Sequence, residues 1–99
     1  MAYVENTVLG IVKARLNRMP SDTSLDDYLK TRIAAVDTEL KRIGITLAED
    51  DVEDTVLLAD VTVWQHQNRD KPGAMPEWLR LRRRERWLSQ RARSEEAGT

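Results

Sequence analysis

The sequence has no cysteine, and only 5% of its residues are aromatic. Without cysteine the chain can form neither a disulfide nor a thiolate metal site, which is compatible with a reducing compartment. No apolar run reaches the roughly 18 residues of a membrane span, and the N-terminus lacks the pattern of a signal peptide. We therefore expect a soluble protein that is made in the cytoplasm and has no membrane partner.

The side chains that catalysis and cofactor binding require are also scarce. His66 is the only histidine, and with no cysteine or serine-rich turn near it we expect a surface or capping residue rather than a base. The carboxylates from Glu49 to Asp54 lack the spacing and the glycine of a calcium loop, and the start of a helix accounts for them better. No glycine-rich phosphate loop is present. We therefore expect that the chain is not an enzyme and that it binds no cofactor and no metal.

Charge is abundant and unevenly distributed. The 99 residues are enough for one domain, and 33% of them are charged, above the roughly 25% of an average globular chain. Residues 1–60 carry 7 Lys/Arg against 12 Asp/Glu, whereas residues 61–99 carry 9 against 5. A chain with an acidic and a basic end can pair head to tail with its own copies, or bind two partners of opposite charge.

Hydrophobic periodicity predicts four helices, at about residues 6–18, 24–43, 49–69 and 76–91. The third is distinctive because it carries two adjoining apolar stripes, a face wider than the roughly 100° of a surface helix. We therefore expect it to be packed on more than one side. The first stripe is Val52, Val56, Ala59 and Val63, and the second is Leu57, Val61 and Trp64.

Residues suited to helix ends mark the boundaries of these four segments. The expected caps are Asn6 or Thr7, Ser24 with Asp27, and Thr46 with Glu49, with Gly44 ending the second helix and Pro76 opening the fourth. The fold class that follows is an all-α small bundle of four helices, with a central third helix and a basic C-terminal helical arm. Residues 1–93 should form this single domain and 94–99 a frayed tail.

Seven arginines fall within the fourteen residues 80–93. Such a density is self-repelling along a helix, and arginine offers a planar fork for carboxylate or phosphate. Three interpretations stay open: a solvated face neutralised by the acidic half of the domain, a surface for an acidic partner or neighbouring subunit, which we favour, and a contact with DNA phosphates. A tryptophan beside arginines is typical of interface hot spots. The expected partner-binding residues are Arg80, Arg82, Arg83, Arg84, Arg86, Trp87, Arg91 and Arg93.

Several segments in this order resemble a known family. They are VKARL at 12–16, LDDYL at 25–29 and VLLADVTVWQHQNR at 56–69. The sequence is similar over roughly residues 8–88 to the small head–tail connector (adaptor) proteins of long-tailed bacteriophages and prophages. Its most specific part is a pair of short motifs, formed by Asn68, Arg69 and Asp70 and by Met75, Pro76 and Leu79.

This resemblance implies a structural virion protein at the head–tail interface. Members of the family form a ring under the portal protein, extend the DNA channel and provide a docking platform for the stopper or head-completion protein. The C-terminal segment commonly docks on the portal, which here corresponds to Arg80–Arg93. We expect the isolated chain to be monomeric or weakly associated at ordinary concentration and to close into a ring only on the portal or when concentrated. Its arginines could also contact packaged DNA non-specifically in the virion. The alternative is a small DNA-binding regulator that uses the arginine-rich helix.

Overall fold

The computed structural model describes residues 3–70 and 73–97, with side chains described as far as residue 92. Within these residues the fold consists of four helices and no strand, so the predicted all-α class is confirmed. The helices are α1 (Glu5–Arg15), α2 (Asp26–Arg42), α3 (Val52–Gln67) and α4 (Glu77–Ala97). No helix in the described ranges is both long enough and apolar enough to cross a membrane.

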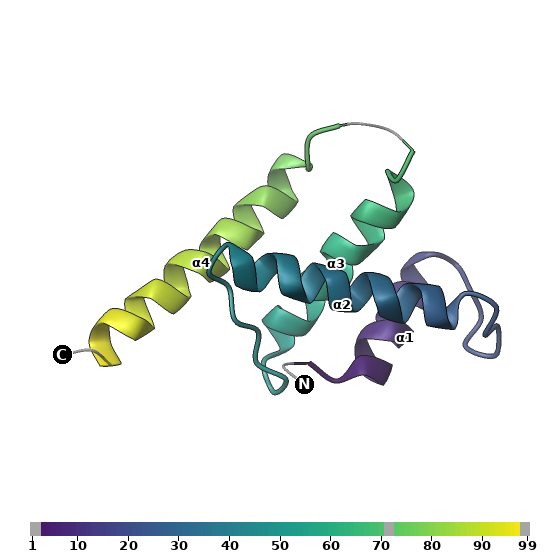
Figure 1. The fold of residues 1–99 in the computed structure, drawn as a ribbon, viewed down its shortest axis with the longest axis horizontal. Helices are drawn as coiled ribbons and strands as arrows, with labels where there is room; N and C mark the ends of the chain where they lie inside the picture. Colours follow the sequence, from purple (N-terminus) through teal and green to yellow (C-terminus); the bar gives the residue numbers. More distant parts are fainter. Residues whose placement is uncertain (1–2, 71–72, 98–99) are drawn as a thin grey trace.

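Helix α3 is the centre of the bundle, as its two apolar stripes predict. It contacts each of the other three helices, and α2 crosses in front of it in Figure 1. Seven consecutive α3 residues, 57–63, are buried. Around them lie side chains from all other elements of the core, namely Val8, Val12, Leu29, Ile33, Val36, Leu40, Ile45, Leu47 and Leu79.

The burial pattern of α3 differs from the predicted stripes at both polar and apolar positions. Val52 is 76% exposed, because it is the first residue of the helix and lies beyond the packed region. Leu58, which belongs to neither predicted stripe, is fully buried. Asp54 and Asp60 were expected outside the stripes, yet their carboxylates are buried and meet arginines of other helices.

Two helices end in the same backbone arrangement. Asn17 (φ 59°) and Gly44 (φ 98°) take the left-handed conformation just after α1 and α2. In each case the next amide bonds back to a carbonyl in the last turn, Arg18 N to Lys13 O at 2.8 Å and Ile45 N to Leu40 O at 2.8 Å. The prediction that Gly44 stops its helix is confirmed, whereas the first helix ends before the predicted residue 18 because Asn17 stops it.

The expected N-terminal caps are wrong for the first three helices. Helix α1 begins after Val4 and α2 after Leu25, neither with a side-chain cap. Ser24 instead donates from its amide and hydroxyl to Asp22. Helix α3 is capped by Asp51, whose carboxylate accepts the amides of Glu53 and Asp54. The predicted capping pair, Thr46 and Glu49, lies before the first turn of the helix.

Helix α4 is the outlying element of the fold. Pro76 lies just before it and accepts the amides of Leu79 and Arg80 through its carbonyl. The helix continues to Ala97, past the predicted end at residue 91, and includes residues expected to be frayed; residues 98–99 lie outside the described ranges. Within the described chain α3 is the one helix that contacts α4, and the C-terminal half of α4 extends beyond the other helices (Figure 1).

Candidate functional site

The arginines of α4 fall into two groups, and the first faces α3. Arg86 is only 7% exposed. Its guanidinium lies 2.6 Å from Asp54 Oδ1, 3.1 Å from Asp51 Oδ2 and 3.4 Å from Glu53 Oε2. The other oxygen of Asp54 accepts the amide of Ala48 at 2.9 Å. One arginine of α4 is thus held by three carboxylates at the N-terminal end of α3.

Arg82 belongs to the same inner group. Its Nη1 lies 2.8 Å from Asp60 Oδ2, and the second oxygen of that carboxylate pairs with Arg15 of α1. Asp60 is 3% exposed, so its charge is compensated within the fold by two guanidiniums. Arg82 and Arg86, both expected to bind a partner, are therefore matched by carboxylates of their own chain.

The second group makes no ion pair with α3 in the described residues. Among the described side chains no carboxylate lies within ion-pair distance of these arginines. They are Arg80, Arg83, Arg84 and Arg91. The guanidinium carbon of Arg91 lies 4.8 Å from the ring centroid of Trp87, a cation–π contact. Arg93 lies within α4, but its side chain is outside the described residues.

Beside this outer group lies an apolar groove between α4 and the end of α2. Its apolar part is formed by Ile43, Ile45 and Trp87, and Arg80, Arg83 and Arg84 complete its lining. The groove has a volume of about 350 Å³. A second hollow of about 250 Å³ shares Ile43 and Arg83 with it and adds Arg42 and Met75. Three arginines that have no ion pair in the described part of the chain thus border an apolar surface.

The position of Trp87 depends on Gly44. Trp87 Nε1 lies 3.0 Å from the place where a Cβ on Gly44 would stand. Gly44 also has a φ of 98°, which other residues adopt only with strain. A second contact fixes α4 nearby, because the amide of Gln90 bonds both the backbone N–H and the carbonyl of Thr46, at 2.8 and 2.7 Å. The groove is therefore built by the segment that ends α2 as much as by α4.

The residues of the two family motifs lie at the junction between α3 and α4. Asn68 Nδ2 donates to the carbonyl of Trp64 at 2.8 Å and closes the last turn of α3. Arg69 donates to the carbonyl of His66, and its Nε is 4.0 Å from Asp70 Oδ2. Met75 packs against the core, Pro76 precedes α4 and Leu79 is fully buried. These six residues shape the helix junction.

His66 packs against Tyr28, and the acidic residues from Glu49 to Asp54 lie around the start of α3. The imidazole Nδ1 of His66 is 3.5 Å from Tyr28 Oη, and the two rings meet edge to face. Burial, then the charges of Arg69 and Arg18, lower the pKa of His66 below its ordinary value of 6.5. In the described residues no three His, Asp or Glu side chains are grouped so that they could hold a metal.

In comparisons with known proteins, no family model, no curated sequence and no solved structure matches this chain. The candidate site is therefore defined by its own chemistry. Sequence reasoning missed Ile43 and Ile45 as site residues, and it missed the inner roles of Asp51, Asp54 and Asp60. A signal was present for Asp60, which lies four residues after Val56 and three before Val63 on the buried side of α3.

Proposed function

We propose that this chain is a structural virion protein, a head–tail connector of a long-tailed phage or prophage. In this role it forms a ring under the portal protein, extends the DNA channel and provides the platform for the stopper protein. The proposal starts from the resemblance at residues 56–82. The observation that carries it is the division of arginines on α4, because one group joins the helix to its own domain while the other is left for an acidic partner surface.

The outer arginines, rather than Arg82 and Arg86, are the proposed contacts with the portal or a neighbouring subunit. Guanidinium groups without internal partners gain most from an incoming carboxylate, because no existing ion pair has to be broken. Among the described side chains Arg80, Arg83 and Arg84 have no ion-pair partner, and Arg91 has a cation–π contact with Trp87 but no carboxylate partner. A closed ring also requires two different patches on each protomer. The unequal charge of residues 1–60 and 61–99 supplies such a pair.

A DNA-binding regulator is a weaker account of the same arginines. Base stacking requires an exposed aromatic face, but Arg91 covers one face of Trp87, and the guanidinium of Arg82 lies 5.5 Å from the ring centroid of Trp78, which is half-exposed. A phosphate ligand would also leave the apolar lining of the groove unused. Contact with packaged DNA in the channel would then be sequence-independent and would weaken steeply with salt.

The test is a reversal of charge on the outer group. The variant Arg80→Glu, Arg83→Glu, Arg84→Glu should fold normally and should abolish joining of tails to filled heads in an assembly reaction. Lys30→Glu alone and Arg84→Glu alone form a matched pair of single charge reversals, of which only the second should reduce joining. Unimpaired joining by the triple variant would refute the connector role of this surface.

A further inference from the structure

The groove beside α4 combines two kinds of surface that one ligand would have to match. Ile43 is 45% exposed at the end of α2. Trp87 is half-buried, and Ile45 lies beneath them in the core. An apolar side chain that covered Ile43 and Trp87 would remove apolar surface from water, which is favourable. The lining alone therefore fits a branched aliphatic side chain.

The cationic part of the lining is placed around this apolar surface. Arg80 and Arg84 are four residues apart on α4, so they lie about 6 Å apart along the helix axis, with Arg83 one residue before Arg84. Like charges at this spacing repel each other and destabilise a helix. A ligand with carboxylates on both sides of its aliphatic side chain would relieve this repulsion and could bind the guanidinium forks in bidentate geometry.

The volume of the groove also limits the ligand. Its 350 Å³ is near the lower end of the roughly 300–1,000 Å³ of ligand pockets. A 250 Å³ hollow beside it shares Ile43 and Arg83 and is lined further by Arg42, Met75 and the acidic Glu39. Two small neighbouring hollows fit successive side chains of an extended segment better than one compact group, and the carboxylate of Glu39 places the acidic side chains of that segment on the side of Arg80 and Arg84.

We infer that the groove formed by Ile43, Ile45, Trp87, Arg80, Arg83 and Arg84 binds a short extended acidic segment of a partner protein, whose aliphatic side chain covers Ile43 and Trp87. The inference rests on the proposed function, since it gives the chemistry of the partner at the same arginines. It assigns no part to Arg82 or Arg86. The apolar lining, which a phosphate backbone would leave unused, commits the site to a protein segment rather than to nucleic acid.

The test uses the full ¹⁵N-labelled chain and the acetylated, amidated peptide Glu-Asp-Leu-Asp-Glu. In two-dimensional NMR spectra the peptide should shift the indole N–H of Trp87 and the amides of residues 43–45, and it should leave the indole N–H of Trp64 in place. Control peptides replace the four acids by Gln and Asn, or the leucine by serine. Each control should bind at least about fivefold more weakly.

Variants separate the groove from general charge attraction. Arg84→Glu and Ile43→Ser should each weaken binding of the peptide at least about fivefold, whereas Lys30→Glu, the same change of charge in the N-terminal half of α2, should weaken it less than about twofold. Arg84 and Ile43 are exposed, and Lys30 pairs with Glu5 at 3.8 Å on the surface, so the fold should be retained, as circular dichroism would verify. Equal effects of Lys30→Glu and Arg84→Glu would overturn the inference, and so would unchanged binding by Ile43→Ser.

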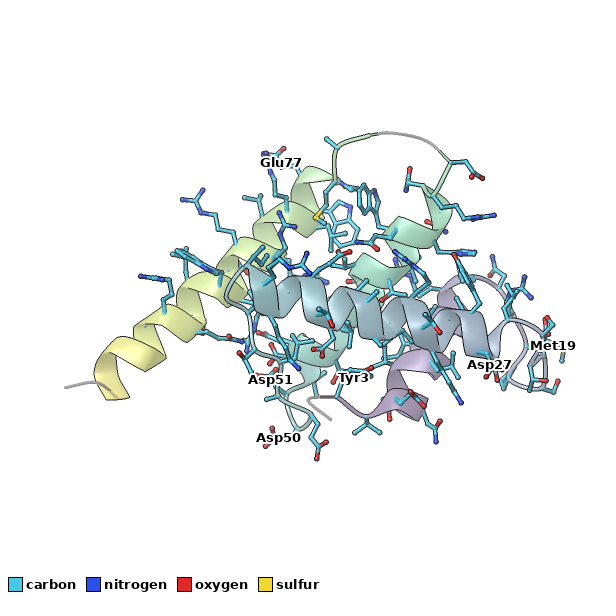
Figure 2. All side chains as sticks on the ribbon, in the orientation of Figure 1. Tyr3, Met19, Asp27, Asp50, Asp51 and Glu77 are labelled. Carbon is cyan, nitrogen blue, oxygen red and sulfur yellow. The ribbon has the colours of Figure 1, made fainter. Side chains whose placement is uncertain are left out.

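Two other ligands provide outcomes that would also overturn it. A peptide of residues 47–53 carries Glu49, Asp50 and Val52, and Asp50 lies at the edge of the molecule (Figure 2). Tighter binding of this peptide would make a second copy of the chain the occupant. Stronger shifts of Trp87 with a short DNA duplex would make it nucleic acid. If the acidic peptide binds but tail joining is intact in the triple arginine variant, the connector role fails and the groove stands; the reverse result rejects the groove alone.

Discussion

Removal of Arg86 should destabilise the fold far more than removal of any other arginine of α4 whose side chain is described. The substitution Arg86→Met keeps much of the apolar stem and deletes the guanidinium that lies 2.6 Å from Asp54 Oδ1. Asp54 is 1% exposed, so its charge would be left buried without its cation. Such a loss costs about 3–5 kcal/mol of unfolding free energy.

The size of this effect is large for a chain of this length. A domain of 99 residues typically has an unfolding free energy of about 5–15 kcal/mol. A loss of 3 kcal/mol corresponds to a fall in Tm of at least about 12 °C for such a domain. Urea denaturation followed by circular dichroism would measure it. The matched control is Arg84→Met, which removes an exposed guanidinium without an ion pair in the described residues and should change stability by less than about 0.5 kcal/mol.

A double-mutant cycle shows whether the loss comes from the Arg86–Asp54 pair. Asp54→Asn keeps an oxygen that can accept the amide of Ala48 and removes the charge. The two changes together should cost less than the sum of the single changes, by about 1–3 kcal/mol. If Arg86→Met costs less than about 1 kcal/mol, or if the cycle shows no coupling, the buried pair does not hold α4 as argued.

Three further predictions concern other parts of the molecule. Gly44→Ala should cost about 1–3 kcal/mol, measured by urea denaturation, because its φ is 98° and the new Cβ would stand 3.0 Å from Trp87 Nε1; an unchanged midpoint would contradict this. The pKa of His66, followed by NMR, should lie below 6.5; since the folded state then binds the proton more weakly than the unfolded state, the contribution of this group to stability is present above pH 6.5 and is lost as the pH falls below it. Analytical ultracentrifugation should find the isolated chain monomeric and find rings only with the portal, because exposed ion pairs are screened over about 8 Å at physiological salt; stable rings without the portal, or persistent monomer with it, would contradict this.

The four helices and the central place of α3 were predictable because both depend on patterns within a single segment. The spacing of Leu57, Val61 and Trp64 beside a second apolar stripe requires neighbours on more than one side wherever the rest of the chain lies. Helix ends were less predictable, because several polar residues compete for each cap. Asp51 and Thr46 both suit the start of α3. In the structure Asp51 is the cap, whereas the backbone of Thr46 is bonded by Gln90, which is 44 residues away.

The inner and outer arginines could not be distinguished from the sequence for the same reason. Arg82, Arg83, Arg84 and Arg86 differ little in local context. Which of them is neutralised depends on two buried aspartates that belong to neither predicted stripe of α3. Only the crossing of α3 and α4 brings Asp60 to Arg82 and Asp54 to Arg86.

Because only the inner arginines pair with carboxylates of α3, α4 could bind a partner through its outer arginines while it stays packed against α3. A helix with one contacting neighbour in the described fold and many like charges would be poorly held by apolar packing alone, since Leu79 is its one fully buried described residue. The ion pairs of Arg82 and Arg86 hold α4 against α3. The carboxylates of a partner would then bind the outer arginines. Neutralising an outer arginine should therefore weaken assembly without loosening α4, whereas neutralising an inner one should weaken assembly only because α4 is no longer held in place.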